Sequence, residues 1–67
     1  MLKVEMERET DGRWLAEVVA LPGVMAYGTT EAEARAKAIV LALRVLADQL
    51  EHGELVPPEA QKWLEAA

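Results

Sequence analysis

The segment 21–38, with the sequence LPGVMAYGTTEAEARAKA, constrains the fold of this chain most, because it contains a turn, a strand and a helix start in succession. It opens with a four-residue reversal at 21–24, in which Pro22 is second and Gly23 is third. This order favours a type II turn, since Pro presets the first central φ and Gly accepts the positive φ that follows. The reversal predicts that the short apolar run 24–27 is a strand antiparallel to the one before it.

A helix start follows directly. Thr30 and Glu33 have the spacing of a capping box, in which the Thr30 hydroxyl accepts from the Glu33 amide and the Glu33 carboxylate reaches back to the Thr30 amide. We expect a helix from about Glu31 to His52, with Gly53 as its C-terminal stop. His52 then lies in the last turn, where capping and the helix dipole explain a cationic residue.

The first twenty residues predict a hairpin. Apolar and charged side chains alternate over 2–9, as expected of a strand with one solvated face, and Asp-Gly at 11–12 indicates a turn into a second strand over 13–20. A two-residue loop would mix acids into the apolar face, whereas a three-residue loop at 10–12 keeps that face apolar and uses Gly12 as its left-handed residue. The expected cross-strand pairs are Arg8 with Trp14, Met6 with Ala16 and Val4 with Val18.

The predicted helix is apolar around most of its circumference. One face carries Ala38, Leu41, Ala42 and Val45, and a neighbouring face carries Ile39, Leu43, Leu46 and Leu50. Three strands cannot cover both faces, and a helix that is apolar on most sides is buried on more than one. We therefore expect a homodimer or higher oligomer, with these candidate interface residues: Ile39, Leu43, Leu46 and Leu50.

The C-terminal tail has weaker signals. The pair Leu55-Val56 could add a brief strand parallel to the first by a right-handed crossover, and Pro57-Pro58 would end it. Residues 59–64 predict a short helix that docks through Trp63 and Leu64. The 67 residues therefore form one domain, 1–67, of the α+β class: a three-stranded antiparallel meander, one long helix packed on it and a tail that is helical.

Composition excludes several classes of function. The formal net charge is −5, with no basic stripe, which argues against direct binding of nucleic acid. The sequence has neither Cys nor Ser and only one His, so no catalytic triad, cofactor or metal site is expected. No leader or membrane-spanning run is apparent, so we expect a cytoplasmic protein that is not an enzyme.

Glutamates gather on one strand face. Glu5, Glu7 and Glu9 share the solvated side of the first strand, and Glu17 joins them from the second. Such a cluster could hold a divalent cation, but the alternation alone requires polar residues here, and Lys3 and Arg13 lie near enough to pair with them. We expect a solvated face suited to protein binding. Tyr27, at the end of the third strand, is a further candidate for this surface, although rim or core packing explains it too.

The motifs also occur in a characteristic order. Asp11-Gly12-x-Trp14-x-Ala16 is followed by Leu21-Pro22-Gly23 and then by Gly28-x-Thr30-x-x-Glu33-Ala34-x-x-x-Ala38. Over residues 2 to about 52 this order resembles the HicB-like antitoxin family. The resemblance implies a partial RNase H-like fold without the nuclease's carboxylates. It also implies a partner, a HicA-type RNA-cleaving toxin whose active site the antitoxin covers. Many members carry a C-terminal DNA-binding domain, for which a chain ending at Ala67 leaves no room.

The resemblance therefore predicts a non-enzymatic antitoxin of a type II toxin-antitoxin system, whose acidic face would meet the basic surface of a HicA-type toxin. An alternative is an orphan HicB-like oligomeric scaffold or small-ligand binder without a toxin partner. A hydrolase or nuclease is the third class, and no constellation in the sequence favours it.

Overall fold

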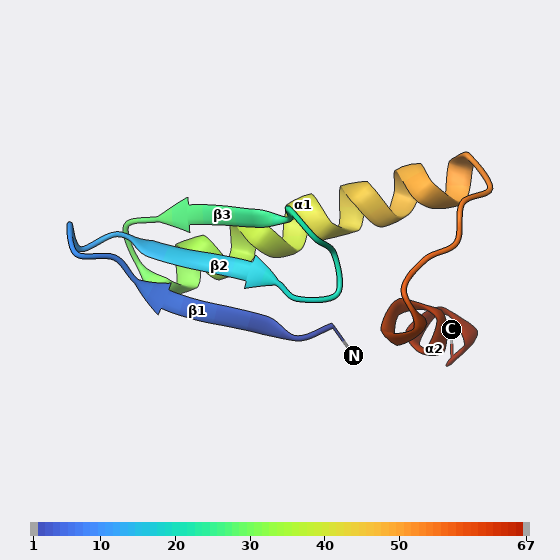
Figure 1. The fold of residues 1–67 in the computed structure, drawn as a ribbon, viewed down its shortest axis with the longest axis horizontal. Helices are drawn as coiled ribbons and strands as arrows, with labels where there is room; N and C mark the ends of the chain where they lie inside the picture. The colour runs from blue at the N-terminus through green and yellow to red at the C-terminus, as the bar shows by residue number, and fades with distance from the viewer. Residues whose placement is uncertain (1, 67) are drawn as a thin grey trace.

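The computed structural model describes residues 2–66 as three strands followed by two helices. The elements are β1 (Val4–Arg8), β2 (Trp14–Val18), β3 (Met25–Gly28), α1 (Glu31–Glu51) and α2 (Pro58–Ala66). The strands form one antiparallel sheet in the order β1-β2-β3, and α1 lies across one face of it (Figure 1). The predicted α+β architecture is confirmed. Neither helix within residues 2–66 has the length and apolar character of a membrane span.

The β1–β2 hairpin has the register that the three-residue loop predicts. Arg8 faces Trp14, and Val4 faces Val18, as Cα partners. The Glu9 amide donates to the Arg13 carbonyl at 2.7 Å, and Gly12 has a φ of 91°. Gly12 thus takes the left-handed position, and the loop sets which side of each strand faces the helix.

The turn between β2 and β3 also forms as predicted. The Val24 amide donates to the Leu21 carbonyl at 3.0 Å, and Gly23 has a φ of 85°, which are the hydrogen bond and the positive φ of a type II turn. The strand β3 begins at Met25, one residue later than the sequence predicted, because Val24 is still held by the turn.

The capping of α1 differs from the prediction in one contact. The Thr30 hydroxyl accepts from the Glu33 amide at 3.1 Å, as expected. The Glu33 carboxylate, however, accepts from the Thr29 amide at 3.0 Å, not from the Thr30 amide. It reaches one residue further back, so the contact ties the end of the preceding loop to the first turn. At the other end His52 caps α1 and Gly53 has a φ of 68°, which confirms the predicted stop.

The core is built on a row of small residues. Ala34, Ala38 and Ala42 of α1 are buried against the sheet, and Gly28 on β3 lies so close that an added Cβ would overlap the backbone of Ala34. Small side chains let α1 approach the sheet closely. The full buried set is Ala16, Val18, Leu21, Val24, Ala34, Ala38, Ala42, Leu46, Val56 and Ala60.

Two of the helix assignments made from the sequence were wrong. Leu46, assigned to the oligomer face, belongs to this core and is only 3% exposed. Leu41, grouped with Ala38, Ala42 and Val45 on an apolar face expected to be buried, is exposed. The periodicity gave two neighbouring apolar faces, and the helix is rotated so that the alanine row and Leu46 point inward.

The tail forms a helix but no strand. Residues 54–57 have no regular structure, so the predicted strand at Leu55-Val56 is absent from the described part of the chain. The predicted short helix is confirmed as α2, with Pro58 at its first position, where a missing N–H is tolerated. Docking occurs chiefly through Val56 and Ala60, both buried, while Trp63 stays more than half exposed.

The molecule is elongated because α1 is longer than the sheet that supports it. Its 21 residues span about 32 Å, against roughly 17 Å for a five-residue strand. The radius of gyration is 12.8 Å, where a compact chain of this length has about 11 Å. The second half of α1 therefore extends past the sheet, and the tail turns back beneath it (Figure 1).

Candidate protein-binding face

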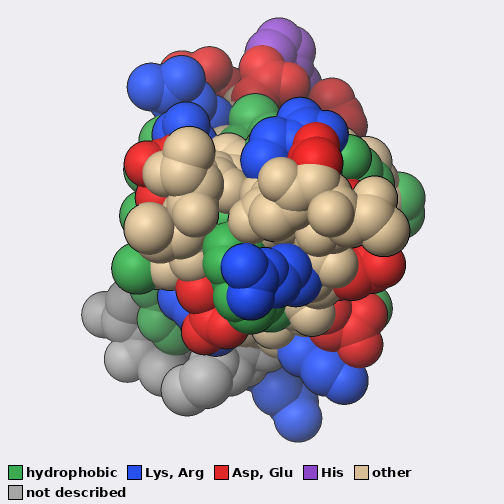
Figure 2. Space-filling view, turned by 90° about the vertical axis from the view of Figure 1, so that its left-hand side faces the viewer, with side chains coloured by type: hydrophobic (Ala, Val, Ile, Leu, Met, Phe, Trp, Pro, Cys, Tyr) green, Lys and Arg blue, Asp and Glu red, His purple; other side chains and the backbone are tan. Residues whose placement is uncertain are grey.

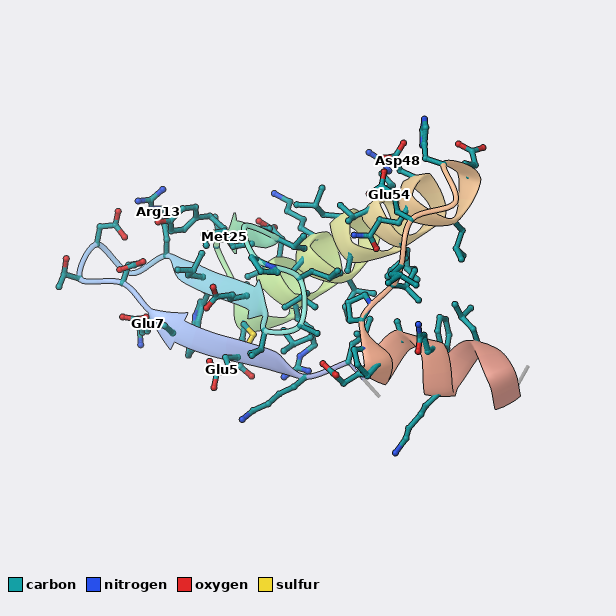
Figure 3. All side chains as sticks on the ribbon, turned by 45° about the vertical axis from the view of Figure 1, so that its right-hand side comes forward. Glu5, Glu7, Arg13, Met25, Asp48 and Glu54 are labelled. Carbon is teal, nitrogen blue, oxygen red and sulfur yellow. The ribbon has the colours of Figure 1, made fainter. Side chains whose placement is uncertain are left out.

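The face of the sheet turned away from α1 brings together the glutamates that the sequence singled out. Glu5 of β1 lies opposite Glu17 of β2, and Glu7 lies opposite Leu15. Together with Met6, these residues line a shallow depression on the sheet. Glu5 and Glu7 project side by side from β1 (Figure 3). We call this surface the outer face; its residues are Glu5, Glu7, Leu15, Glu17, Met25 and Tyr27.

The outer face changes character from one edge to the other. Its acids stand on β1 and on the adjoining end of β2. Towards β3 the register continues with Leu15 opposite Tyr27 and Glu17 opposite Met25. Met25 and Tyr27 are both exposed. The face thus combines an acidic side with an apolar side, a composition suited to binding a protein surface that has a basic region beside an apolar one.

Glu9 extends the acidic side beyond the end of β1. Its amide bonds to Arg13, and the residue is half-buried at the start of the hairpin loop. Glu9 is therefore held next to Glu7 by the loop, at the same edge. All four glutamates predicted as candidates lie on or beside one face of the sheet.

Arg13 does not pair with these glutamates, contrary to the sequence-based expectation. Its guanidinium Nε donates to the Asp11 carboxylate at 2.8 Å, and its Cζ lies 4.3 Å from the centre of the Tyr27 ring. A backbone N–H from Arg13 also donates to Asp11, and this bond, aided by the guanidinium, lowers the pKa of the Asp11 carboxyl below its ordinary value. Arg13 is thus engaged locally, while Lys3 does lie 3.5 Å from Glu5 in an exposed ion pair.

Tyr27 is positioned by this stacking. With the Arg13 guanidinium over its ring, the exposed side chain is held at the boundary between the hairpin loop and the apolar side of the face. A cation over an aromatic ring contributes about 0.5–1 kcal/mol at an exposed site, enough to favour one orientation. The end of the molecule that carries the hairpin loop shows acidic and basic side chains interspersed, with hydrophobic ones only in small areas (Figure 2).

The predicted oligomer residues divide into two groups. Ile39, Leu43 and Leu50 are exposed along one side of α1, while Leu46 is in the core. Ile39 and Leu43 lie beside β1, where they line a groove with Leu2, Val4, Val18, Arg35, Ala42 and Trp63. Three of the four predicted interface residues are therefore accessible to a partner.

A second cluster was missed by the sequence analysis. Asp48, His52 and Glu54 offer ligand atoms that all lie within 4.8 Å of one another, at the end of α1 (Figure 3). No metal site was expected at His52 because the sequence has no second His or Cys, whereas an Asp four residues earlier and a Glu after the Gly53 stop supply carboxylates. The His52 Nδ1 lies 2.8 Å from the Asp48 carbonyl and 3.3 Å from its carboxylate, so these groups already satisfy each other at the exposed helix end.

Comparison of the chain with protein-family models, curated proteins and solved structures gave no match. The likeness to HicB-like antitoxins therefore remains a prediction that depends on the sequence motifs.

Proposed function

We propose that this chain is a non-enzymatic protein-binding module of the HicB-like antitoxin type, which acts in the cytoplasm and neutralises a HicA-type RNA-cleaving toxin by covering its active site. The observation that supports the proposal is the outer face, where Glu5, Glu7 and Glu17 share one surface with exposed apolar residues. A ribonuclease holds phosphate with positive charge, and an acidic face is complementary to such a site.

The charge arrangement also explains why the chain would bind protein and not RNA itself. The glutamates face solvent beside one another, and a phosphate backbone would be repelled from them. The basic residues that lie near, Lys3 and Arg13, are already close to Glu5 and Asp11. The face as a whole presents negative charge at one side and apolar surface at the other.

The test is the affinity for a HicA-type toxin of a variant in which Glu5, Glu7, Glu9 and Glu17 are all replaced by Gln. Because exposed charges act mainly through long-range attraction, we expect binding to weaken about tenfold or more at low salt, and to lose most of its salt dependence. Unchanged affinity and salt dependence would reject the outer face as the toxin-binding surface.

The matched control removes the same charge elsewhere. Asp48→Asn together with Glu51→Gln, Glu54→Gln and Glu59→Gln also removes four negative charges, but at the far end of α1 and in the tail. We expect this variant to bind within about threefold of the unsubstituted chain. An equal loss in both variants would mean that net charge alone, and no particular face, governs binding.

A second candidate is an oligomeric scaffold without a toxin partner, and one observation favours it. Ile39, Leu43 and Leu50 expose an apolar row on α1 that a second copy could cover. A small domain gains stability from such association because its own core is limited. A concentration-independent monomer in sedimentation at micromolar concentration would reject this candidate.

A further inference from the structure

The sheet has an open edge beside β1 whose backbone groups are directed outward. The Glu9 amide bonds to the Arg13 carbonyl, and the Val19 amide bonds to the Lys3 carbonyl at 3.1 Å. These two bonds show which backbone groups pair along the antiparallel ladder: the N–H and C=O groups of the odd-numbered residues of β1 point toward β2. The N–H and C=O groups of Val4, Met6 and Arg8 therefore point to the open edge, a template for another strand.

The inner side of this edge is an apolar groove. It is bounded by Leu2 just before β1, by Val4 of β1, by Ile39 and Leu43 from α1 and by Trp63 from α2, with Arg35 as the charged residue in its lining. The groove encloses about 300 Å³, roughly twice the cavity of about 150 Å³ that accommodates benzene. Two apolar side chains of an added strand would fill it. Ile39 and Leu43 are exposed on α1 beside this edge strand.

The outer side of the same edge is acidic, which decides between a second copy and a different partner. In an antiparallel pair of β1 strands centred on Met6, Glu5 would oppose Glu7 of the copy, and the next registers would set Glu5 or Glu7 against its own equivalent. Like charges directly opposed on a sheet are destabilising. A strand with Lys or Arg at alternate positions would instead be attracted at the same sites.

We propose that the β1 edge receives one strand of a basic protein partner, with Lys or Arg on its outer side and apolar residues on its inner side. The added strand would bond to Val4, Met6 and Arg8, pair its charges with Glu5 and Glu7, and bury its apolar side chains against Ile39, Leu43 and Trp63. This inference rests on the proposed function, since it specifies how the basic partner is held.

The test uses a capped heptapeptide of alternating Lys and Val as the probe. We expect it to bind the chain and to slow hydrogen exchange at the amides of Val4, Met6 and Arg8. A peptide in which Glu replaces Lys should not bind, and neither should one with its Lys and Val residues separated into blocks. Binding of either control peptide with similar affinity would overturn the proposal.

Two proline variants distinguish binding at the β1 edge from binding at the β3 edge. Met6→Pro removes an outward N–H of β1, and Met25→Pro removes the equivalent outward N–H at the β3 edge, where the Val18–Val24 bond fixes the alternation. We expect Met6→Pro to weaken peptide binding about tenfold or more and Met25→Pro to change it less than about twofold. If Met6→Pro does not fold, the hydrogen-exchange rate of the Met6 amide is measured in the unsubstituted chain with and without peptide. An unchanged rate rejects the proposal.

The outcomes also separate this inference from the proposed function. If toxin binding depends on the glutamates but leaves the exchange rate of the Met6 amide unchanged, strand addition at the β1 edge is rejected. That result would still support the antitoxin function. Peptide binding without toxin binding would support the edge and reject that toxin as its occupant. Slower Met6 exchange at higher protein concentration, with no peptide present, would show that a second copy occupies the edge and would overturn the proposal.

Discussion

Two rows of apolar residues run along α1, and they have opposite surroundings. Ala34, Ala38, Ala42 and Leu46 form the inner row, which is buried in the core, whereas Ile39, Leu43 and Leu50 form the side row, which is 40–52% exposed. The inner row consists mostly of alanine and therefore has the smaller and less hydrophobic side chains. Its small residues allow close approach to the sheet, while Ile39 and Leu43 of the side row face the open edge of β1. Apolar character alone therefore does not identify the core of this domain; the size of the side chains that fit under the sheet does.

A charge placed in each row should affect stability very differently. Leu46→Glu puts an unpaired carboxylate into the core and should destabilise the fold by more than about 4 kcal/mol, close to the whole stability of a small domain. Leu43→Glu places the same charge on the side row and should change stability by less than about 0.5 kcal/mol. Circular dichroism during urea unfolding measures both. Equal loss in the two variants would mean that Leu43 is covered in solution, as the oligomeric candidate requires.

The close approach of the inner row is tested at Gly28. A Cβ at this position would overlap backbone atoms of Ala34, which cannot move aside as a flexible side chain could. We expect Gly28→Ala to destabilise the domain by about 2–3 kcal/mol, which corresponds to a fall of roughly 10–20 °C in Tm. Differential scanning calorimetry gives the value. An unchanged Tm would show that α1 lies further from β3 than the structure has it.

The smallest effect concerns the capping contacts at the start of α1. The Thr29 amide, followed by the Lys37 ammonium, lowers the pKa of Glu33 below its ordinary value of 4.5. A lowered carboxyl pKa stabilises the folded state above the ordinary value, and the contribution is lost as pH falls through the lowered pKa. Melting curves from pH 6 to pH 3 should therefore show a smaller decline for Glu33→Gln than for the unsubstituted chain.

The control for this prediction is Glu31→Gln, which changes an exposed acid in the same first turn. This variant keeps the Glu33 contacts and should retain the pH dependence of the unsubstituted chain. If Glu33→Gln and Glu31→Gln decline equally, the Glu33 contacts do not contribute to stability in solution.

The elements that the sequence predicted well are those fixed by local chemistry. The Gly12 loop, the type II turn and the Gly53 stop each depend on a few adjacent residues, and all three formed as expected. The glutamates of the outer face followed from alternation along β1 and the register of the hairpin, so their common face was predictable as well.

The features that could not be predicted from the sequence include those that depend on contacts between distant segments. Leu46 was assigned to an oligomer face because three strands were expected to cover only one of the two apolar faces of the helix. Instead, Val56 and Ala60 join Leu46 in the core, and β1 keeps a free edge. The cluster of Asp48, His52 and Glu54 was missed for a different reason: its residues are close in the sequence, but Glu54 approaches the helix end only because the chain turns at Gly53.

Binding of a basic protein to the acidic outer face and the β1 edge can be tested by titrating a HicA-type toxin into the isotope-labelled chain and following amide chemical shifts and exchange. We expect shift changes at Glu5, Glu7 and Glu17, slowed exchange at Met6, and little change at Val40 and Arg44 of α1. Changes confined to α1, or none at toxin concentrations above micromolar, would contradict this expectation.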